Sequence, residues 1–260
     1  MDRATIARLD RINRDFYVAH AGAFAATREA PWPGWERLLP HLRRLRPAAG
    51  GAGGALRILD AGCGSGRLAR WLHARLERPP RCVGLDRSLP ILLLAADGTA
   101  AAPPPAAWIL ADLVSSEGRV PCRTAAFDAT AAIGLLHHVP SFALRRALIE
   151  DLLRLLRPGG LLALAFWQFG ADPRFERRAV AWELATDVDP DELEPGDRLL
   201  AWGESAAAER AAGGVLRYCH YTDPGEADRL TDGLPAEIVE AYLADGRTGR
   251  LNLYRILRRT

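Results

Sequence analysis

Hydrophobic and polar positions follow two alternating spacings from residue 56 onward. Short apolar runs, typical of buried strands, occupy residues 56–61, 81–86, 107–111, 127–133 and 160–167. Apolar positions at helical spacing occupy the segments 67–78, 88–97 and 142–156. Because strands that alternate with helices need crossover connections, the pattern predicts an α/β fold with a doubly wound parallel sheet covered by helices on both faces.

This alternation of predicted strands and helices is interrupted at residues 168–216 and then resumes. The interrupting segment is acidic and rich in Ala and Glu, which predicts a mostly helical insertion over the carboxyl edge of the sheet. After it, the pattern predicts a strand at 216–222, a helix at 225–232 and strands at 236–244 and 251–258. The short connection 245–249 makes the last two strands an antiparallel pair.

The N-terminal part of the chain, residues 2–46, is also predicted to be helical. The helix is interrupted at Pro31-Trp32-Pro33-Gly34, because proline disfavours helical geometry in the residue before it. The glycine-rich residues 50–54 indicate a flexible connector. We therefore expect a helical segment of residues 1–50 and one α/β domain of residues 51–260, with 168–216 as its insertion.

Composition excludes several classes of function. No apolar run reaches the 18 residues or so of a membrane-spanning helix, and the first residues lack the apolar core of a secretory signal, so a cytoplasmic protein is expected. All 34 basic residues are arginine, which excludes Schiff-base chemistry, a phosphate-binding lysine and a lysine base. The 4 cysteines lack zinc-type spacing, so no metal site is expected.

The net charge of +2 does not by itself argue for a nucleic-acid partner. Its distribution is uneven, since arginines exceed acids in residues 1–55 and 245–260 and acids exceed arginines in 183–209. Two interpretations remain open: a basic end that meets an anionic partner, or an unevenly charged, solvated surface.

The clearest chemical signal follows the strand at 56–61. This strand ends at Asp60, and Gly62, Gly64 and Gly66 follow at alternate positions before a helix begins. Glycines permit a tight turn and let a ligand approach bare backbone, and the start of a helix offers free N–H groups. A glycine turn of this kind is predicted to bind a nucleotide-like ligand.

Two further acids refine the ligand. Asp86 closes the second strand 20 residues after Gly66, where a carboxylate accepts hydrogen bonds from ribose hydroxyls, and Asp112 follows the third strand. Asp60 would repel a pyrophosphate but suits an ammonium group. The three acids therefore favour a phosphate-free, amino-acid-bearing adenosine. An NAD(P) oxidoreductase or a non-catalytic nucleotide-binding module is the alternative of another class.

These motifs together resemble the class I S-adenosylmethionine-dependent methyltransferases, of the kind called methyltransferase type 11. The resemblance rests on D-A-G-C-G-S-G at 60–66, G-L-D-R-S at 84–88, A-D-L at 111–113, F-D at 127–128 and L-R-P-G-G at 156–160. It implies a Rossmann-like fold with a mostly parallel seven-stranded sheet, an N-terminal helical lid, an insertion after the fifth strand and S-adenosylmethionine as cofactor.

The same resemblance implies roles for individual cofactor-binding residues. Gly62, Cys63, Gly64 and Gly66 would line the methionine side, and Asp60 would approach its amino group. Asp86 would hold the ribose, with Arg87 beside it at the cofactor. Asp112 and Leu113 would flank the adenine.

A second, narrower resemblance is to the eukaryotic wobble-uridine carboxymethyl tRNA methyltransferases. It is carried by Asp15-Phe16-Tyr17, Phe24, Thr27-Arg28, Pro31 to Trp35, His137-His138 and Arg217-Tyr218-Cys219-His220. Cys219 stands where that family usually shows an aromatic residue, and the insertion here is short and acidic. The resemblance implies methylation of a carboxylate oxygen on a modified tRNA uridine, and a small activator protein as a possible partner. A small metabolite is the alternative acceptor.

A carboxylate acceptor needs no general base, so the protein would mainly align it by proximity. The residues expected to orient it are Tyr17, Arg28, His137, Arg217 and Tyr218. Each also has a plain structural interpretation: Arg28 as a helix-surface residue, His137 as a packing residue, and Arg217 and Tyr218 as parts of a packed strand. Trp32 and Trp35 are expected to pack the N-terminal helical segment.

Overall fold

The computed structural model describes residues 1–47, 54–97, 106–185, 187–202 and 215–260. The predicted connector at 50–54 lies largely outside the described residues. No helix in the described parts of the chain is long and apolar enough to cross a membrane. The division into residues 1–50 and 51–260 stays a prediction.

A seven-stranded, mostly parallel sheet forms the centre of the fold, in the order β3-β2-β1-β4-β5-β10-β9. Its strands are β1 (Arg57–Ala61), β2 (Arg81–Asp86), β3 (Ala106–Leu110), β4 (Phe127–Ile133), β5 (Leu156–Trp167), β9 (Ala236–Ala244) and β10 (Asn252–Arg259). The first five run parallel, and β10 pairs antiparallel with both β5 and β9. The predicted α/β fold is confirmed, and so is the antiparallel final pair.

Helices cover both faces of this sheet. The helices of the described residues are α1 (Arg3–Ala26), α2 (Leu39–Arg44), α3 (Arg67–Arg75), α4 (Leu89–Ala96), α5 (Phe142–Leu155), α6 (Pro173–Glu176) and α8 (Pro224–Thr231). Short 3-10 helices are η1 (Pro33–Leu38), η3 (Leu136–His138), η4 (Phe169–Ala171), η5 (Trp182–Leu184) and η6 (Pro190–Glu192). The predicted break in the N-terminal helix is present, because α1 ends before Pro31 and η1 begins at Pro33.

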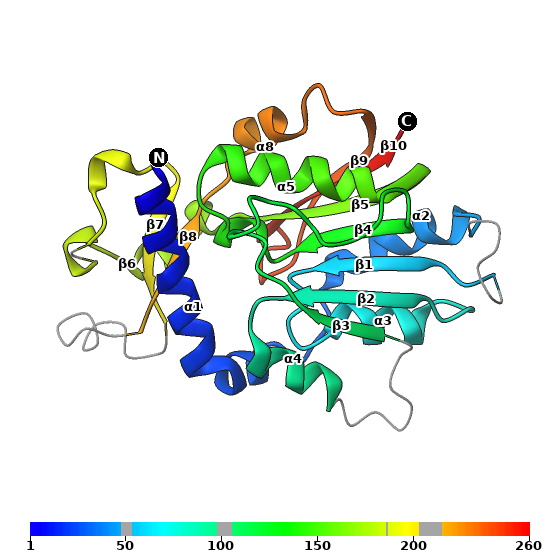
Figure 1. Ribbon diagram of the computed structural model, residues 1–260, viewed down its shortest axis with the longest axis horizontal. Helices are drawn as coiled ribbons and strands as arrows, with labels where there is room; N and C mark the ends of the chain where they lie inside the picture. Colours follow the sequence, from blue (N-terminus) through cyan, green and yellow to red (C-terminus); the bar gives the residue numbers. More distant parts are fainter. Residues whose placement is uncertain (48–53, 98–105, 186, 203–214) are drawn as a thin grey trace.

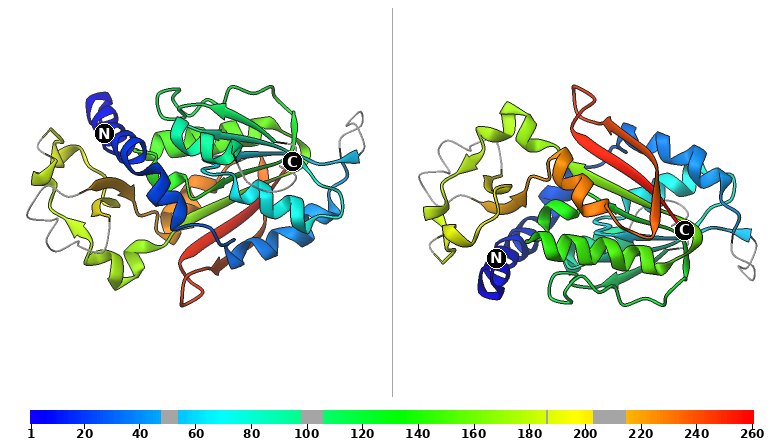
Figure 2. Two further views of the ribbon diagram at one scale, coloured as in Figure 1. Left: turned by 90° about the horizontal axis from the view of Figure 1, so that it is seen from below. Right: turned by 90° about the horizontal axis from the view of Figure 1, so that it is seen from above.

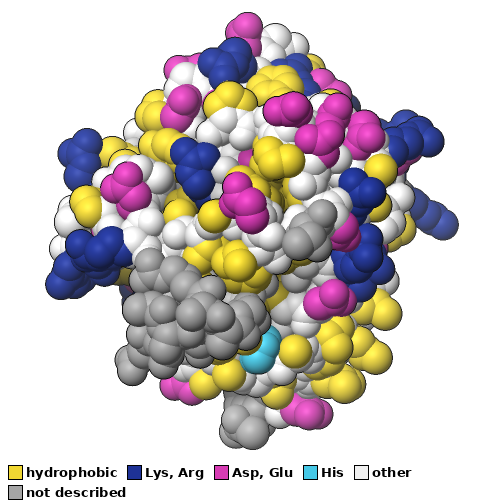
Figure 3. Space-filling model, turned by 90° about the vertical axis from the view of Figure 1, so that its left-hand side faces the viewer, with side chains coloured by type: hydrophobic (Ala, Val, Ile, Leu, Met, Phe, Trp, Pro, Cys, Tyr) yellow, Lys and Arg dark blue, Asp and Glu magenta, His cyan; other side chains and the backbone are white. Residues whose placement is uncertain are grey.

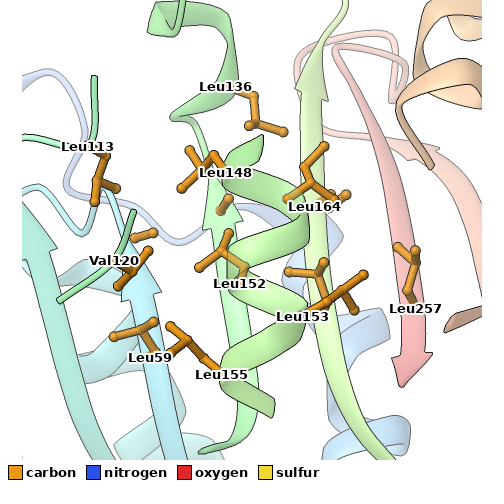
Figure 4. Packing of buried hydrophobic residues seen from close by; sticks show 14 of the residues in the cluster. Leu59, Leu113, Val120, Leu136, Leu148, Leu152, Leu153, Leu155, Leu164 and Leu257 are labelled. Carbon is orange, nitrogen blue, oxygen red and sulfur yellow. The ribbon is translucent and has the colours of Figure 1, made fainter. Parts of the chain in front are cut away.

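Two hydrophobic clusters hold the helices on the sheet. Successive strand residues point to opposite faces, so Leu59 packs with α5 and α8 while its neighbour Ile58 packs with α2, α3 and η1. Figure 4 shows Leu148, Leu152 and Leu155 of α5 beside the strands on the first face. The core thereby fixes the carboxyl ends of β1, β2 and β4 at one edge of the sheet.

Beyond that edge lies a second, three-stranded antiparallel sheet, β6-β7-β8 (Figure 1). It comprises β6 (Ala179–Val180), β7 (Asp197–Ala201) and β8 (Leu216–His220). The prediction of a mostly helical insertion is therefore wrong for the described residues. Ala and Glu favour helices locally, but β7 is held by pairing with β8, which follows the insertion in sequence, and composition does not reveal such a pairing.

Helix α1 lies between the two sheets. It packs against β8 on one side and α4 on the other, and both views of Figure 2 show it crossing the edge where the parallel strands end. Its N-terminus is capped by Asp2, whose side chain accepts a hydrogen bond from the backbone N–H of Thr5. The N-terminal helix thus covers the strand ends, as a lid would.

Candidate active site

A cavity of about 760 Å³ opens under α1 at the carboxyl ends of β1, β2 and β4. This volume is within the range of sites that enclose organic ligands. Its walls come from the loops after these strands, from α1 and from β8. Of the predicted site residues, those that line it are Tyr17, Arg28, Asp60, Gly62, Cys63, Gly64, Asp86, Arg87, Asp112, Leu113, His137 and Arg217.

The glycine loop is tied to the end of β2. The backbone N–H groups of Gly62 and Cys63 both donate to the carbonyl oxygen of Leu85, at 2.8 and 2.9 Å. The N–H of Gly64 donates to Asp86 at 2.9 Å, and a Cβ on Gly64 would meet nothing closer than Ile91 at 4.0 Å. Bare backbone therefore borders open space in the cavity.

Gly66 requires a correction, because it does not line the cavity. It caps α3 with φ +76°, and a Cβ there would lie 2.5 Å from the ring of Trp108. Close approach of the tryptophan and the left-handed backbone explain this glycine, rather than contact with a ligand.

Asp60 is a buried carboxylate with no hydrogen bond or ion pair among the described residues, and it is 5% exposed. Burial, together with the nearby charge of Asp86, raises the pKa of Asp60 to about 7. Asp86 differs because it accepts hydrogen bonds from Gly64 and Ser88, although burial still raises its pKa. Asp60 is therefore the acid that most needs a positive partner.

Arg87 lines the cavity, but its guanidinium is directed to the lid. It pairs with both carboxylate oxygens of Asp10 on α1, and with Asp112 at 3.2 Å. Arg14 also pairs with Asp10, at 2.9 Å. We call this group of Asp10, Arg14, Arg87 and Asp112 the lid latch. The assignment of Arg87 to the cofactor stays a prediction, and the structure adds that its charge holds α1 on the sheet.

Two arginines that have no ion pair with any described residue enter the other half of the cavity. Arg217 of β8 is 3% exposed, and its Nε and Nη1 have no hydrogen-bond partner among the described residues. Arg28 follows α1 and lies over the ring of Phe24 at 4.1 Å, with its Nε also buried and unpartnered. Burial and the nearby charge of Arg217 lower the pKa of Arg28 to about 10. Such a pair strongly favours an anion.

Two neutral histidines lie beside these arginines. Burial, with the charge of the neighbouring groups, lowers the pKa of His137 well below its usual value and that of His138 to about 3. His138 Nδ1 lies 3.1 Å from the carbonyl oxygen of Tyr218, so this nitrogen carries the proton. His138 Nε2 therefore accepts from the hydroxyl of Tyr17, at 2.8 Å.

Donor atoms of His137, His138 and Cys219 lie within 4.8 Å of one another, a spacing that could hold a metal ion. However, His138 uses both ring nitrogens in hydrogen bonds, and burial raises the pKa of the Cys219 thiol to about 11. The charge of Arg217 further disfavours a cation there. The chemistry of this end of the cavity suits an anion.

Tyr218 also requires a correction, since it does not line the cavity. Adjacent strand residues point to opposite sides, so Arg217 and Tyr218 cannot both face the same ligand. The Tyr218 hydroxyl instead donates to Asp197 at 2.7 Å, beneath β8. His220 lies on that same side, where its two ring nitrogens contact Asp197 and Glu226 at 2.7 and 2.8 Å.

The comparisons with known proteins begin with the part of the chain that carries the glycine loop. Residues 58–160 match the family described as methyltransferase domain. This segment of the chain is similar to methyltransferase domains. The predicted resemblance to the class I methyltransferases is thereby confirmed, and with it the Rossmann-like fold and S-adenosylmethionine as cofactor. The oxidoreductase alternative is not supported.

Among the relatives of this methyltransferase domain is the tRNA (carboxymethyluridine(34)-5-O)-methyltransferase alkbh8 of Xenopus tropicalis. It is 28% identical over 170 residues, which cover 65% of this chain and 23% of that protein. The chain thus spans about a quarter of that relative.

Solved structures show the same fold at lower identity. The 1,6-didemethyltoxoflavin-N1-methyltransferase of Burkholderia thailandensis has a TM-score of 0.61 at 20% identity, over 100% of this chain and 92% of that one. A putative methyltransferase of Haloferax volcanii, solved in complex with the Trm112 methyltransferase activator, has a TM-score of 0.54 at 16% identity, over 94% and 96%.

The cavity fits a cofactor that carries an amino acid on adenosine. The ammonium group would complete the unpartnered Asp60, and the open space beside Gly64 admits a close backbone contact. Asp86, which is predicted to hold the ribose, also lines the cavity. When bound, the cofactor supplies an electrophilic methyl group.

Some residues of the methyltransferase cavity were not predicted from sequence. Asn13, one turn before Tyr17 on α1, lines the cavity, and neither of its amide atoms has a hydrogen-bond partner in the described part of the chain. Helical spacing from Tyr17 could have indicated it. The aromatic side chains of Trp167 and Trp202 also line the wall. Trp32 and Trp35 line it too, and Trp35 packs in addition against Trp71 in the core.

Proposed function

We propose that this methyltransferase transfers the methyl group of S-adenosylmethionine to a carboxylate oxygen of its acceptor. The observation that carries this proposal is the pair of cavity arginines, Arg28 and Arg217, which lack a counter-ion among the described residues. Buried positive charges are costly unless an anion joins them. A carboxylate placed between them would be aligned for attack.

The remaining side chains also suit a carboxylate. A carboxylate oxygen loses no proton when it accepts a methyl group, so no general base is required. His138 is neutral and already accepts a hydrogen bond from the hydroxyl of Tyr17. Burial raises the pKa of Tyr17 to about 12, so this hydroxyl stays protonated. These groups can hold and orient an anion and exclude water, and proximity would supply most of the rate.

For the acceptor, we propose the carboxymethyl group of a modified tRNA uridine. The support is the similarity to the relatives named as carboxymethyluridine methyltransferases, together with the anion site. The proposal is tested by calorimetry on protein saturated with S-adenosylhomocysteine. 5-Carboxymethyluridine should bind at least about tenfold more tightly than neutral 5-methyluridine, and Arg217→Gln should abolish the difference. Equal binding of both nucleosides by the native protein contradicts the proposal.

A small-molecule carboxylate is a second candidate acceptor. The negative charge of the insertion favours it, because an acidic surface repels the phosphates of tRNA. The face of the molecule that carries the insertion shows acidic, basic and hydrophobic side chains interspersed, with no continuous basic surface among the described residues (Figure 3). Affinity for bulk tRNA that falls steeply with salt supports the tRNA acceptor, because phosphate contacts release counter-ions. Absence of tRNA binding at low salt supports the small molecule.

We also propose a small activator protein as a partner, docked on the edge of the main sheet. Strand β3 is an edge strand, and Leu110 at its end is 56% exposed, with Leu89 and Leu93 of α4 also more than half exposed. Unpaired strand edges and apolar patches are typical docking sites. Leu93→Glu should abolish co-purification with an activator of the Trm112 kind without changing the affinity for S-adenosylhomocysteine, and retained co-purification contradicts this surface.

A further inference from the structure

Asn13 on α1 is a polar side chain that the protein leaves without partners. The residue is 1% exposed, and neither its carbonyl oxygen Oδ1 nor its amide nitrogen Nδ2 has a hydrogen-bond partner among the described residues. An unsatisfied buried donor or acceptor costs about 1–3 kcal/mol. Because Asn13 lines the cavity, a bound ligand can complete both groups.

The neighbours of Asn13 on α1 locate it within the cavity. Asp10 and Tyr17 lie one turn before and one turn after it, on the same face of the helix. Asp10 belongs to the lid latch, whose other members Arg87 and Asp112 follow β2 and β3. Tyr17 contacts His138, after β4. Asn13 therefore lies between the latch and the histidines, on the side of the cavity where adenine is expected.

Asp112, which is predicted from sequence to flank the adenine, already accepts hydrogen bonds from the protein at both carboxylate oxygens. Its Oδ1 accepts from the backbone N–H groups of Val114 and Ser115, and its Oδ2 accepts from the Ser115 hydroxyl and from Arg87. Hydrogen bonds and the charge of Arg87 outweigh burial and lower the pKa of Asp112. Its carboxylate thus stabilises the loop and the lid latch.

The chemistry of Asn13 matches the edge of an adenine. A carboxamide presents an acceptor and a donor side by side in one plane, and adenine presents an amino donor beside a ring-nitrogen acceptor. We propose that Asn13 recognises the adenine of the cofactor, accepting from its amino group and donating to the adjacent ring nitrogen. This inference rests on the proposed function only in that it takes S-adenosylmethionine as cofactor.

The test compares two ligands and two variants by calorimetry. The ligands are S-adenosylhomocysteine and its analogue in which purine, lacking the amino group, replaces adenine. The native protein should bind the first about tenfold more tightly, and Asn13→Leu should lose most of this discrimination. Asp112→Asn, the matched control, should keep the discrimination even where its absolute affinity falls.

Thermal unfolding of the unliganded proteins supplies a second readout. Asn13→Leu removes no hydrogen bond, so its unfolding temperature should equal or exceed that of the native protein, whereas a structural asparagine would lower it. The inference is overturned if Asn13→Leu keeps the discrimination, or if Asp112→Asn loses it instead. A native protein that binds neither ligand contradicts the proposed function rather than the role of Asn13.

Discussion

At the scale of single residues, the site is defined by charged groups that the protein leaves unpaired. Among the described residues, Asp60 has no ion pair at one end of the cavity, and Arg28 and Arg217 have none at the other. Since desolvated charge is unfavourable without a partner, each of these groups lowers the stability of the unliganded protein. The side chains that are placed to bind ligands therefore lower the free energy of unfolding of the unliganded protein.

Asp60 predicts a pH dependence of cofactor binding. Its raised folded pKa of about 7 means that the carboxylate is only partly ionised in the unliganded protein near neutral pH. The affinity for S-adenosylhomocysteine should increase as the pH rises from 6 to 8, because the ligand ammonium needs the ionised form. Calorimetry across this range should find the increase in the native protein but not in Asp60→Asn. A flat native profile would show that Asp60 does not meet the ammonium.

Arg217 predicts opposite effects on stability and on acceptor binding. Arg217→Met removes an unpaired buried charge and keeps much of the apolar stem, so the free energy of unfolding should stay equal or rise by about 1 kcal/mol. Methyl transfer should fall by at least about a hundredfold, because the acceptor loses a charge-assisted contact. Denaturant unfolding and a labelled-methyl assay measure the two effects. A destabilised but active variant would identify Arg217 as a packing residue.

At the scale of elements, a buried ionic network lies on the side of β8 that faces away from the cavity. His220 donates to both Asp197 and Glu226, and Arg145 of α5, fully buried, pairs with Glu226 at 2.8 Å. Arg145 also pairs with Glu194 of the insertion. The network therefore links the second sheet to α5 and α8, and it supports the strand whose opposite side carries Arg217.

This network predicts a pH-dependent stability. Burial opposes protonation of His220, but hydrogen bonds to Asp197 and Glu226 outweigh it and raise the pKa of His220 above 6.5. The stabilisation of the fold by protonated His220 is thus complete below pH 6.5. It is lost as the pH rises through the raised pKa of the folded state. His220→Gln should cost about 3 kcal/mol of unfolding free energy at pH 6 and less at alkaline pH.

The control for this experiment is His41→Gln. His41 pairs with Glu240 at 2.6 Å on the far side of the sheet, but both side chains are partly exposed. Its removal should cost about 1 kcal/mol or less, since both side chains keep contact with solvent, which screens their interaction. Equal losses in both variants, or a loss that grows at alkaline pH, would contradict an imidazolium at His220.

The lid latch predicts a kinetic effect. Asp10 is 2% exposed and joins α1 to the loops after β2 and β3 through Arg87. Asp10→Asn should accelerate dissociation of S-adenosylhomocysteine about tenfold, because the lid opens more readily once its ion pairs are weakened. Stopped-flow displacement measures the rate, and an unchanged rate would mean that α1 does not gate the cofactor.

At the scale of the whole molecule, local signals predicted the main domain well. The apolar runs and glycine loop lie close together in sequence, and the parallel sheet follows from them. The second sheet was not predicted, because β7 and β8 pair across the insertion rather than within one segment. The side of β8 that faces the cavity depends on the same pairing, and this is why Arg217 and Tyr218 could not be distinguished from sequence.

The ion-pair partners of individual charged residues could not be predicted from the sequence either. Arg87 follows Asp86 directly, so the motif placed it at the cofactor, but its ion pair is with Asp10, 77 residues away. Asn13 carried no motif at all. Such contacts depend on how α1 docks on the strand ends, which the sequence pattern does not specify.

The most direct test of the central claim is the chemical form of the transferred methyl group. The native protein is incubated with methyl-labelled S-adenosylmethionine, bulk tRNA and carboxylic acid pools, and the labelled product is treated with mild alkali. The account predicts a carboxyl methyl ester, so the label should be released as methanol, and Arg217→Met should form little of it. Label that stays on the acceptor in alkali would place the methyl group on nitrogen or carbon and contradict the account.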